Sequence, residues 1–227
     1  MSAAIGTIED PCVLLLALPL AGYLIGSIPF GFLIARARGV DIRKVGSGNV
    51  GATNVGRVLG RKWGYLCFFL DVAKGAVPVV LAGMLVCRQG GLPTAIEQAC
   101  WLGVGCGAVL GHVFNPWLKF RGGKGVATTL GVVLGVFPYF TWAGLSALAI
   151  WIAVTLLSRY VSLGSIVAAV AFLPLLAAFN RSSLGALWPL MAFAGAISVL
   201  IVIRHRANIR RLLAGTENKI GRKDKQG

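Results

Sequence analysis

Long apolar stretches separated by short polar connections run along almost the whole chain. The stretches span residues 12–35, 64–87, 96–114, 125–138, 140–157, 161–179 and 184–203. A helix needs about 20 predominantly apolar residues to cross a bilayer, and most of these stretches approach or exceed that length. The stretch 125–138 is shorter and is either a short tilted span or a re-entrant segment. The pattern predicts an all-α integral membrane protein with about seven transmembrane helices.

The composition supports the same class. Of the 227 residues, 57% are hydrophobic and 13% are charged, whereas about a quarter of the residues in a soluble domain are charged. We expect residues 1–227 to form a single transmembrane domain with a basic tail at about 204–227. The net charge of +15 comes from basic residues in the short connections and not from one soluble face, so we expect anionic partners and the lipid bilayer but no nucleic acid.

The placement of Lys and Arg predicts the orientation in the membrane. With seven spans, nearly all of these residues fall on one side, in the connections 36–63, 115–124 and 158–162 and in the tail. Only Arg88 and Arg181 fall on the other side. The positive-inside rule therefore predicts that the N-terminus is outside and the C-terminus is cytoplasmic. Any chemical site is expected on the cytoplasmic face.

The first polar connection contains GSGNVGATNVGR at residues 46–57. Its start fits the G-x-G-x-x-G pattern of dinucleotide-binding turns, but that pattern requires a preceding buried strand, and its apparent acidic partner, Asp71, lies in a predicted span. Glycine instead lets successive backbone N–H groups surround an anion, while hydroxyl, amide and guanidinium groups supply further donors. The candidate binding residues are Ser47, Asn49, Gly51, Thr53, Asn54 and Arg57. A plain flexible turn is the alternative.

The second connection, in HVFNPWLKFRGGKGVATT, repeats this chemistry. Its candidate residues are Lys119, Arg121, Gly122, Gly123, Lys124 and Gly125. The chain then enters the fourth stretch, and a helix N-terminus stabilises phosphate through its unpaired N–H groups and partial positive charge. The segment is not a Walker A loop, because Leu118 stands where the first glycine is required. Unless this is only a flexible basic loop, two anion-binding loops on one face indicate a substrate with two phosphates or two phosphorylated substrates.

Histidines and intramembrane charges add candidates whose roles the sequence leaves open. His205 and Asn208 share a helix face after the last span, where a basic amphipathic tail lying on anionic lipid is the alternative. His112 fits a structural role at least as well as a catalytic one. Asp71 and Lys74 either pair to orient their span or line a cavity. Because the cysteines and histidines show no metal-ligand spacing, neither a metal nor a cofactor is expected.

Four segments resemble, in order, the motifs of the bacterial membrane acyl-phosphate:glycerol-3-phosphate acyltransferase family (PlsY). They are GSGNVGATNVGR, GHVFNPWLKFRGGKGVAT, SRYVSLGS and RHRANIRRLLAGTE, and the second span adds LDVAKG at residues 70–75. The chain departs from the family at Val50, where proline is usual, and at Asn115-Pro116, where proline is expected one place earlier. Both departures affect loop conformation and not a charged or nucleophilic group.

The resemblance implies transfer of an acyl group from acyl phosphate to glycerol 3-phosphate, which gives 1-acyl-glycerol-3-phosphate (lysophosphatidate) and phosphate. It implies a site on the cytoplasmic face of the bacterial inner membrane and, as a partner, an enzyme that produces acyl phosphate. The glycine loop with Lys124 would bind glycerol 3-phosphate, and the first connection would hold the acyl-phosphate head. The expected catalytic residues are Ser47, Arg57, Lys124, His205 and Asn208, with Ser162 and Ser165 closing the site. Either His205 or a substrate phosphate is the general base.

A transporter or channel for an organic phosphate is the main alternative to an enzyme. Basic loops and an intramembrane ion pair would serve a transporter too, but the chain has no convincing internal repeat of the kind common in transporters. A lipid phosphatase is a weaker alternative, because no nucleophile site is evident. The sequence does not specify the acyl-chain preference or the oligomeric state.

Overall fold

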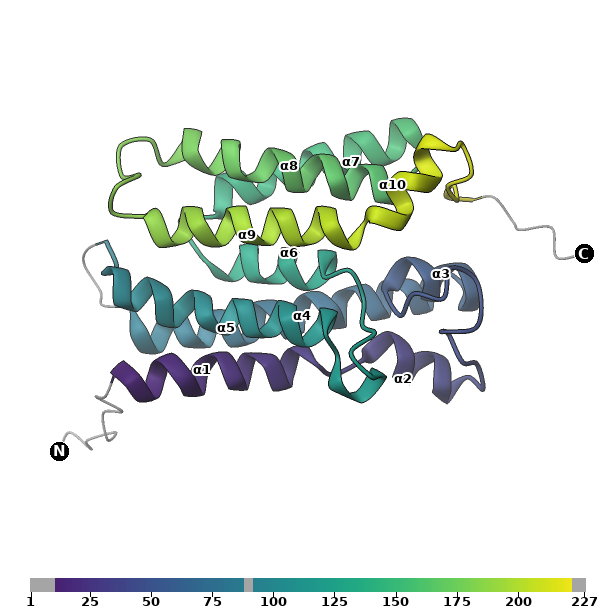
Figure 1. Cartoon of the computed structure of the whole chain (residues 1–227), viewed down its shortest axis with the longest axis horizontal. Helices are drawn as coiled ribbons and strands as arrows, with labels where there is room; N and C mark the ends of the chain where they lie inside the picture. The colour runs from purple at the N-terminus through teal and green to yellow at the C-terminus, as the bar shows by residue number, and fades with distance from the viewer. Residues whose placement is uncertain (1–10, 88–91, 222–227) are drawn as a thin grey trace, which may run out of the picture.

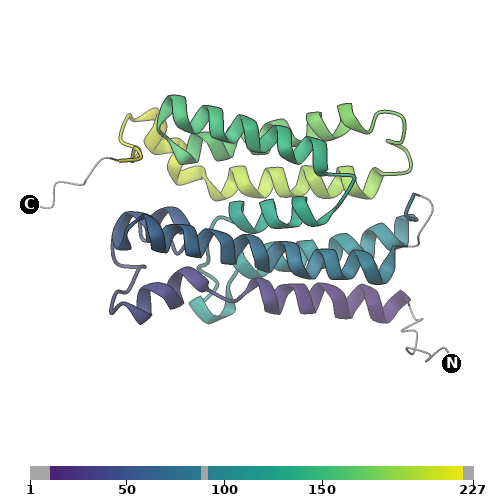
Figure 2. The same cartoon turned by 180° about the vertical axis from the view of Figure 1, so that it is seen from behind.

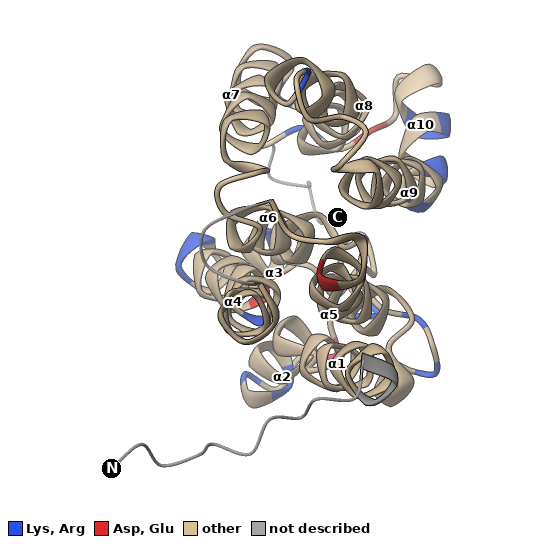
Figure 3. Cartoon of the chain, turned by 90° about the vertical axis from the view of Figure 1, so that its left-hand side faces the viewer, with Lys and Arg blue, Asp and Glu red and all other residues tan. Residues whose placement is uncertain are grey.

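The computed structural model describes residues 11–87 and 92–221, and these ranges contain helices but no strand. The helices are α1 Pro11–Gly26, α2 Phe30–Ala37, α3 Ala52–Leu59, α4 Arg61–Val86, α5 Ala95–Val113, the short 3₁₀ helix Pro116–Leu118, α6 Val126–Gly135, α7 Thr141–Ser158, α8 Val161–Phe179, α9 Trp188–Arg204 and α10 Arg206–Leu213. The long helices lie side by side along one axis (Figures 1 and 2). Seen end-on, α6 lies between a group containing α1, α4 and α5 and a group containing α7, α8 and α9 (Figure 3). The predicted all-α class is confirmed for the described residues.

Each predicted apolar stretch coincides with helical structure, but not every helix is long and apolar enough to cross a membrane. Four helical stretches in the described ranges meet that condition, and the pair α9 and α10, bent by 55°, makes five if it is one span. Helix α6 has 10 residues and therefore rises only about 15 Å, against a hydrocarbon core of about 30 Å. Length and composition thus support a multi-pass protein without establishing the expected seven spans.

Glycines allow α1 and α5 to pack with their backbones in contact. A Cβ atom added at Gly22 or Gly26 would overlap the backbone of α5, and one added at Gly107 or Gly111 would overlap the backbone of α1. Such contacts are typical of helices in membranes, where close van der Waals packing replaces the hydrophobic effect as the force between helices. The sequence pattern of small residues therefore determines which face of α5 meets α1.

The first apolar stretch is broken between α1 and α2, and side chains from elsewhere bind the freed carbonyl groups. Asn115 Nδ2 donates to Ser27 O at 2.6 Å, and Lys74 Nζ donates to Ile28 O at 2.8 Å. Trp117 Nε1 donates to Ser27 Oγ at 2.9 Å. Because an unpaired carbonyl is costly in an apolar interior, these bonds stabilise the break and tie the second polar connection to it.

The polar segments of the chain gather at one end of the bundle. This end holds the connection 38–51, helices α2, α3 and α10 and the described C-terminal residues, whereas α1 begins at the other end (Figure 1). Arg88, expected on the opposite side, lies outside the described residues, as does the tail from residue 222. A core that includes Val79, Trp101 and Phe140 joins residues of the two helix groups.

Candidate functional site

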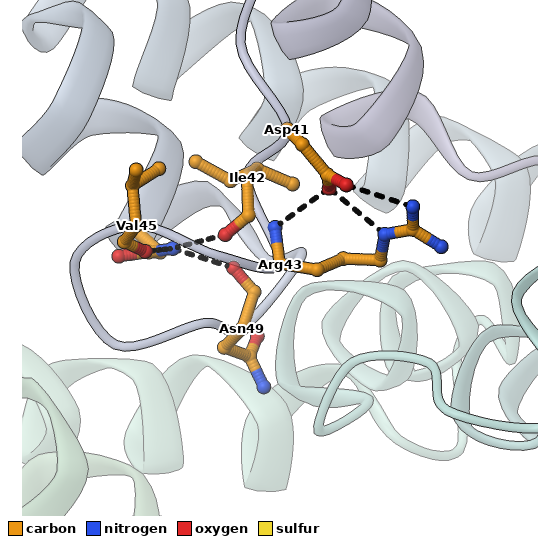
Figure 4. A network of polar contacts seen from close by, with 6 residues as sticks. Asp41, Ile42, Arg43, Val45 and Asn49 are labelled. Carbon is orange, nitrogen blue, oxygen red and sulfur yellow. Dashed lines mark hydrogen bonds and ion pairs between the residues drawn. The ribbon is translucent and has the colours of Figure 1, made fainter.

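Asn54 organises the connection that precedes α3. Its Nδ2 faces the carbonyl oxygens of Ile42, Val45 and Asn49 at 3.3, 3.1 and 2.9 Å. Figure 4 shows Ile42, Val45 and Asn49 close together in this connection. Its Oδ1 accepts a hydrogen bond from Ser47 N at 2.8 Å, and the side chain is buried. The carboxamide is thus used by the loop itself, and we assign Asn54 to shaping the loop where the sequence led us to expect a substrate contact.

The remaining candidates of the first connection differ in their exposure. Ser47 and Thr53 are exposed, and Asn49 Oδ1 accepts a hydrogen bond from Gly51 N at 2.8 Å. Arg57 is partly buried on α3. Within the described ranges its guanidinium group has no hydrogen-bond or ion-pair partner, so its donors are available to an anion.

The glycine loop before α6 is folded back onto the end of α5. Gly122 N donates to Val113 O, and Gly123 N donates to His112 O, each at 3.1 Å. A Cβ atom at Gly123 would overlap the ring of His112, and Gly125 adopts a φ of 84°, a conformation that favours glycine. The loop amides at Gly122 and Gly123 are therefore paired internally, and N–H groups in the first turn of α6 remain as donors for an anion.

A chain of hydrogen bonds connects Lys124 to three distant segments. Lys124 Nζ donates to Asn208 Oδ1 at 2.6 Å, and Asn208 Nδ2 donates to Glu217 Oε1 at 2.6 Å. The same carboxylate accepts hydrogen bonds from Ser162 Oγ at 2.8 Å and from Arg211 Nε at 2.7 Å. The second, third and fourth sequence motifs thus meet at one place, although they are far apart along the chain.

The bend between α9 and α10 brings His205 into this region. The two helices meet at an angle of 55°, and His205 is buried at the junction with Nδ1 2.8 Å from Ile201 O. Because a carbonyl oxygen can only accept, Nδ1 carries the proton and Nε2 is an acceptor in the neutral ring. Arg204 Nη2 donates to Gly123 O at 3.3 Å, which joins this bend to the glycine loop.

Burial sets the protonation of the site. It lowers the pKa of Lys124 to about 8, and nearby cations, Arg57 among them, act in the same direction while Glu217 opposes them. Burial, together with the charge of Lys124, lowers the pKa of His205 to about 4. Burial raises the pKa of the Glu217 carboxyl, but its three hydrogen bonds outweigh that effect and lower the pKa below its usual value. At neutral pH the site therefore holds a neutral histidine and a lysine whose charge is easily lost.

Three expected site residues lie apart from this network. Lys119 and Arg121 are exposed on the loop, and their side chains make no contact with the network within the described ranges. Ser165 Oγ donates to Val161 O at 2.9 Å and accepts a hydrogen bond from Trp151 Nε1 at 3.1 Å. The expected binding roles of these three residues stay predictions.

Three residues around the network were not among those selected from the sequence. Glu217 is an acid in a strongly basic tail, a signal that could have been used, whereas nothing local distinguishes Arg204 and Arg211 from the other arginines around them. No group of three or more His, Cys, Asp and Glu side chains in the described residues could hold a metal ion.

An apolar cavity adjoins the network and runs between α4, α6, α7, α8 and α9. Val126, Ser165 and Ile201 line it close to the residues described above. Phe172 also lines it, seven residues beyond Ser165 and therefore about 10 Å further along α8. Its ring packs edge-to-face on Phe140, with ring centroids 5.3 Å apart. The arrangement places the cationic side chains of the network, Lys124 and Arg211, beside an apolar cavity.

The chain is similar over most of its length to known acyltransferases. A family model described as glycerol-3-phosphate acyltransferase matches residues 16–215. The chain is 48% identical over 204 residues to the glycerol-3-phosphate acyltransferase of Geobacter sulfurreducens, with 90% of this chain and 96% of that protein covered. It is 44% identical over 205 residues to that of Aquifex aeolicus, with coverage of 90% and 98%. The matched range includes every expected site residue from Ser47 to Asn208.

Two solved structures have a similar fold. One is the glycerol 3-phosphate form of PlsY, an integral membrane glycerol 3-phosphate acyltransferase, with a TM-score of 0.77 and 42% identity over 91% of this chain and 96% of that one. The other is the lysophosphatidic acid form, with a TM-score of 0.74 and 42% identity over 91% and 95%. This likeness covers 91% of the chain and agrees with an integral membrane protein.

We expect the substitution Asn54→Asp to destabilise the protein by about 1–3 kcal/mol, the cost of leaving buried hydrogen-bonding groups unpaired. The new carboxylate would place an oxygen against three carbonyl oxygens. Thermal unfolding in detergent and protease cleavage within residues 38–51 measure the effect. The exposed neighbour Thr53→Ala is the control, and equal losses in the two variants would contradict the role assigned to Asn54.

Proposed function

We propose, for a chain that belongs to the glycerol-3-phosphate acyltransferase family, that the donor is acyl phosphate and that the products are 1-acyl-glycerol-3-phosphate and phosphate. The observation that carries this proposal is the position of the partly buried Lys124 beside an apolar cavity. Acyl phosphate combines an anionic head with a long apolar chain, and glycerol 3-phosphate is a second anion. A cationic surface next to an apolar space is suited to both.

The two phosphates divide between two segments. The glycine loop, with Lys124 and the N-terminus of α6, binds the phosphate of glycerol 3-phosphate, because the helix terminus adds N–H donors and a favourable dipole. Arg57, with its unpaired donors, and the exposed hydroxyl groups of Ser47 and Thr53 hold the head of acyl phosphate. Asn208 keeps Lys124 in place through a hydrogen bond to its uncharged carboxamide oxygen, which leaves the positive charge of Lys124 available to the ligand.

The reaction needs alignment more than a covalent intermediate, because acyl phosphate is a reactive mixed anhydride. The primary hydroxyl oxygen of glycerol 3-phosphate attacks the carbonyl carbon, a C–O ester bond forms, and the C–O bond to phosphate breaks. Holding the two reactants in line converts a bimolecular step into a unimolecular one. A donor aimed at the developing oxyanion contributes about 3–4 kcal/mol, and Ser47 and Arg57 are the groups to which we assign this role.

A substrate phosphate, rather than His205, takes the hydroxyl proton. A general base is most effective when its pKa is close to the working pH, and burial lowers the pKa of His205 to about 4. The second pKa of a phosphate group is about 6, so the departing phosphate is the stronger base and carries the proton away. His205 then serves to hold the end of α9 through its bond to Ile201.

The membrane supplies one substrate and the cytoplasm the other. The acyl chain enters the cavity from the bilayer, with Ser165 at its polar end and Phe172 beyond. The seven helical stretches cross the inner membrane of a bacterium with the N-terminus outside, because this arrangement places the basic loops and tail in the cytoplasm. An enzyme that produces acyl phosphate, a labile compound, is the partner that this reaction requires.

The donor is tested with purified protein, labelled glycerol 3-phosphate and synthetic acyl phosphate, with acyl-CoA and acyl-carrier-protein thioesters as competing donors. We expect acylated product from acyl phosphate alone. Activity with a thioester and none with acyl phosphate would overturn the proposed donor. In liposomes, movement of glycerol 3-phosphate across the bilayer without product would instead favour a transporter.

The lowered pKa of Lys124 predicts an alkaline limb in the pH profile. Above pH 8 or so the ammonium group loses its proton, so kcat/KM for glycerol 3-phosphate should fall as the pH rises through about 8. Lys124→Arg keeps its charge in that range and should remove this limb, even if its absolute activity is lower. Lys119→Arg is the matched control, and an unchanged limb in Lys124→Arg would rule out Lys124 as its source.

A second prediction concerns the base. His205→Asn retains an N–H donor for Ile201 O, so we expect a loss in kcat of less than about tenfold, because removing a general base usually costs a factor of about 10²–10⁴. The pH profile between 5 and 8 should keep its shape. A loss beyond a hundredfold together with the disappearance of a limb would instead identify His205 as the base.

A further inference from the structure

Three ionisable side chains lie together in the interior of the bundle. On α4, Lys74 Nζ is 2.7 Å from Asp71 Oδ1, and His112 Nδ1 on α5 is 3.7 Å from the same oxygen. Asp71 is 2% exposed, Lys74 4% and His112 7%. None of the three lines the apolar cavity. Of the two roles that the sequence left open for Asp71 and Lys74, mutual pairing is the one that their contacts support.

This cluster has further contacts with the break between α1 and α2 and within its own helix α4. Lys74 Nζ donates to Ile28 O at 2.8 Å, and Cys67 Sγ is 3.7 Å from Asp71 Oδ2. A buried ion pair is a poor source of stability, because well-packed apolar side chains of similar volume are often as stable. The contacts that the cluster makes with functional segments are therefore the better guide to its role.

His112 connects the cluster to the glycine loop. Its carbonyl oxygen accepts the hydrogen bond from Gly123 N at 3.1 Å, and its ring lies so close that a Cβ atom at Gly123 would overlap Nε2. The next residue is Lys124, followed by the first turn of α6. A displacement of the ring would therefore be transmitted directly to the loop and its lysine.

We propose that Asp71, Lys74 and His112 are positioning residues that fix the turn at Gly123 and thereby place Lys124 and the N-terminus of α6 for the phosphate of glycerol 3-phosphate. Lys74 holds the carboxylate of Asp71, the negative charge of Asp71 orients the imidazole ring of His112, and the ring supports the loop. None of the three touches a substrate. This inference rests on the proposed binding role of Lys124 and its loop.

The contact between His112 and Gly123 is tested with a double-mutant cycle on the purified full-length protein. Gly123→Ala pushes the loop off the ring, and His112→Ala removes the support. Each should raise the dissociation constant for glycerol 3-phosphate, measured by calorimetry without a donor, by about tenfold, within the range of interaction energies between contacting residues. In the double variant the methyl group occupies space left by the ring, so the combined effect should be clearly smaller than the product of the two.

A matched control separates positioning from general packing. Gly83, further along α4, also faces an aromatic ring, and a Cβ atom there would be 2.9 Å from Trp101 Cε2. Gly83→Ala therefore introduces the same methyl group against a ring away from the loop. It should lower the unfolding temperature without changing the dissociation constant for glycerol 3-phosphate.

The charged pair is tested by removing both charges at once. Asp71→Asn combined with Lys74→Met leaves no unpaired buried charge, so the protein should fold. The dissociation constant and the KM for glycerol 3-phosphate should both rise by about fivefold to tenfold, while the KM for acyl phosphate changes by less than about twofold. If the pair had a structural role alone, the unfolding temperature would fall, and the KM values for the two substrates would not change by different factors.

Two results would overturn the positioning role. The first is that the variants fold and bind glycerol 3-phosphate with wild-type affinity. The second is that the increases in dissociation constant caused by His112→Ala and Gly123→Ala simply multiply in the double variant. Failure of the proposed function has a different signature, since the wild-type protein would then bind glycerol 3-phosphate yet not use acyl phosphate. The calorimetric measurements need no donor, so they decide the positioning role in that case too.

Discussion

A backbone group that is buried in an apolar bundle must find its hydrogen-bond partner within the protein, and this constraint governs the break after α1 and the glycine loop before α6. The break after α1 is stabilised by Lys74 and Asn115, which bind the carbonyl groups that the break leaves free. The glycine loop is held by α5 and by Arg204. Irregular backbone, which a functional site needs, is thus tolerated where side chains from distant helices reach it.

The hydrogen-bond partners of the charged side chains also explain the electrostatics of the site. Lys124 is bound by the neutral amide of Asn208, and the carboxylate of Glu217 is occupied by three donors. A lysine paired directly with a carboxylate would have its charge neutralised before a ligand arrived. Here burial lowers the pKa of Lys124 to about 8, and a phosphate dianion bound beside it would stabilise the ammonium form.

The interior cluster and the cavity connect the site to the two halves of the bundle in different ways. The proposed role of His112 makes the glycine loop dependent on α4 and α5, whereas the cavity is formed between α4, α6 and the helices α7 to α9. Affinity for the polar substrate and preference for the acyl chain would then be controlled by separate sets of residues.

Hydropathy and composition determined the all-α class, the approximate ends of the helices and the common location of the polar loops, because these properties depend on local runs of residues. The motifs likewise identified Lys124, His205, Asn208 and Ser162. Only the tertiary structure decided that the first stretch is broken, that Asn54 is used by its own loop, and that Glu217 completes the network. Lys124 and Asn208 lie 84 residues apart, and no local pattern encodes which of many polar side chains will meet when helices pack.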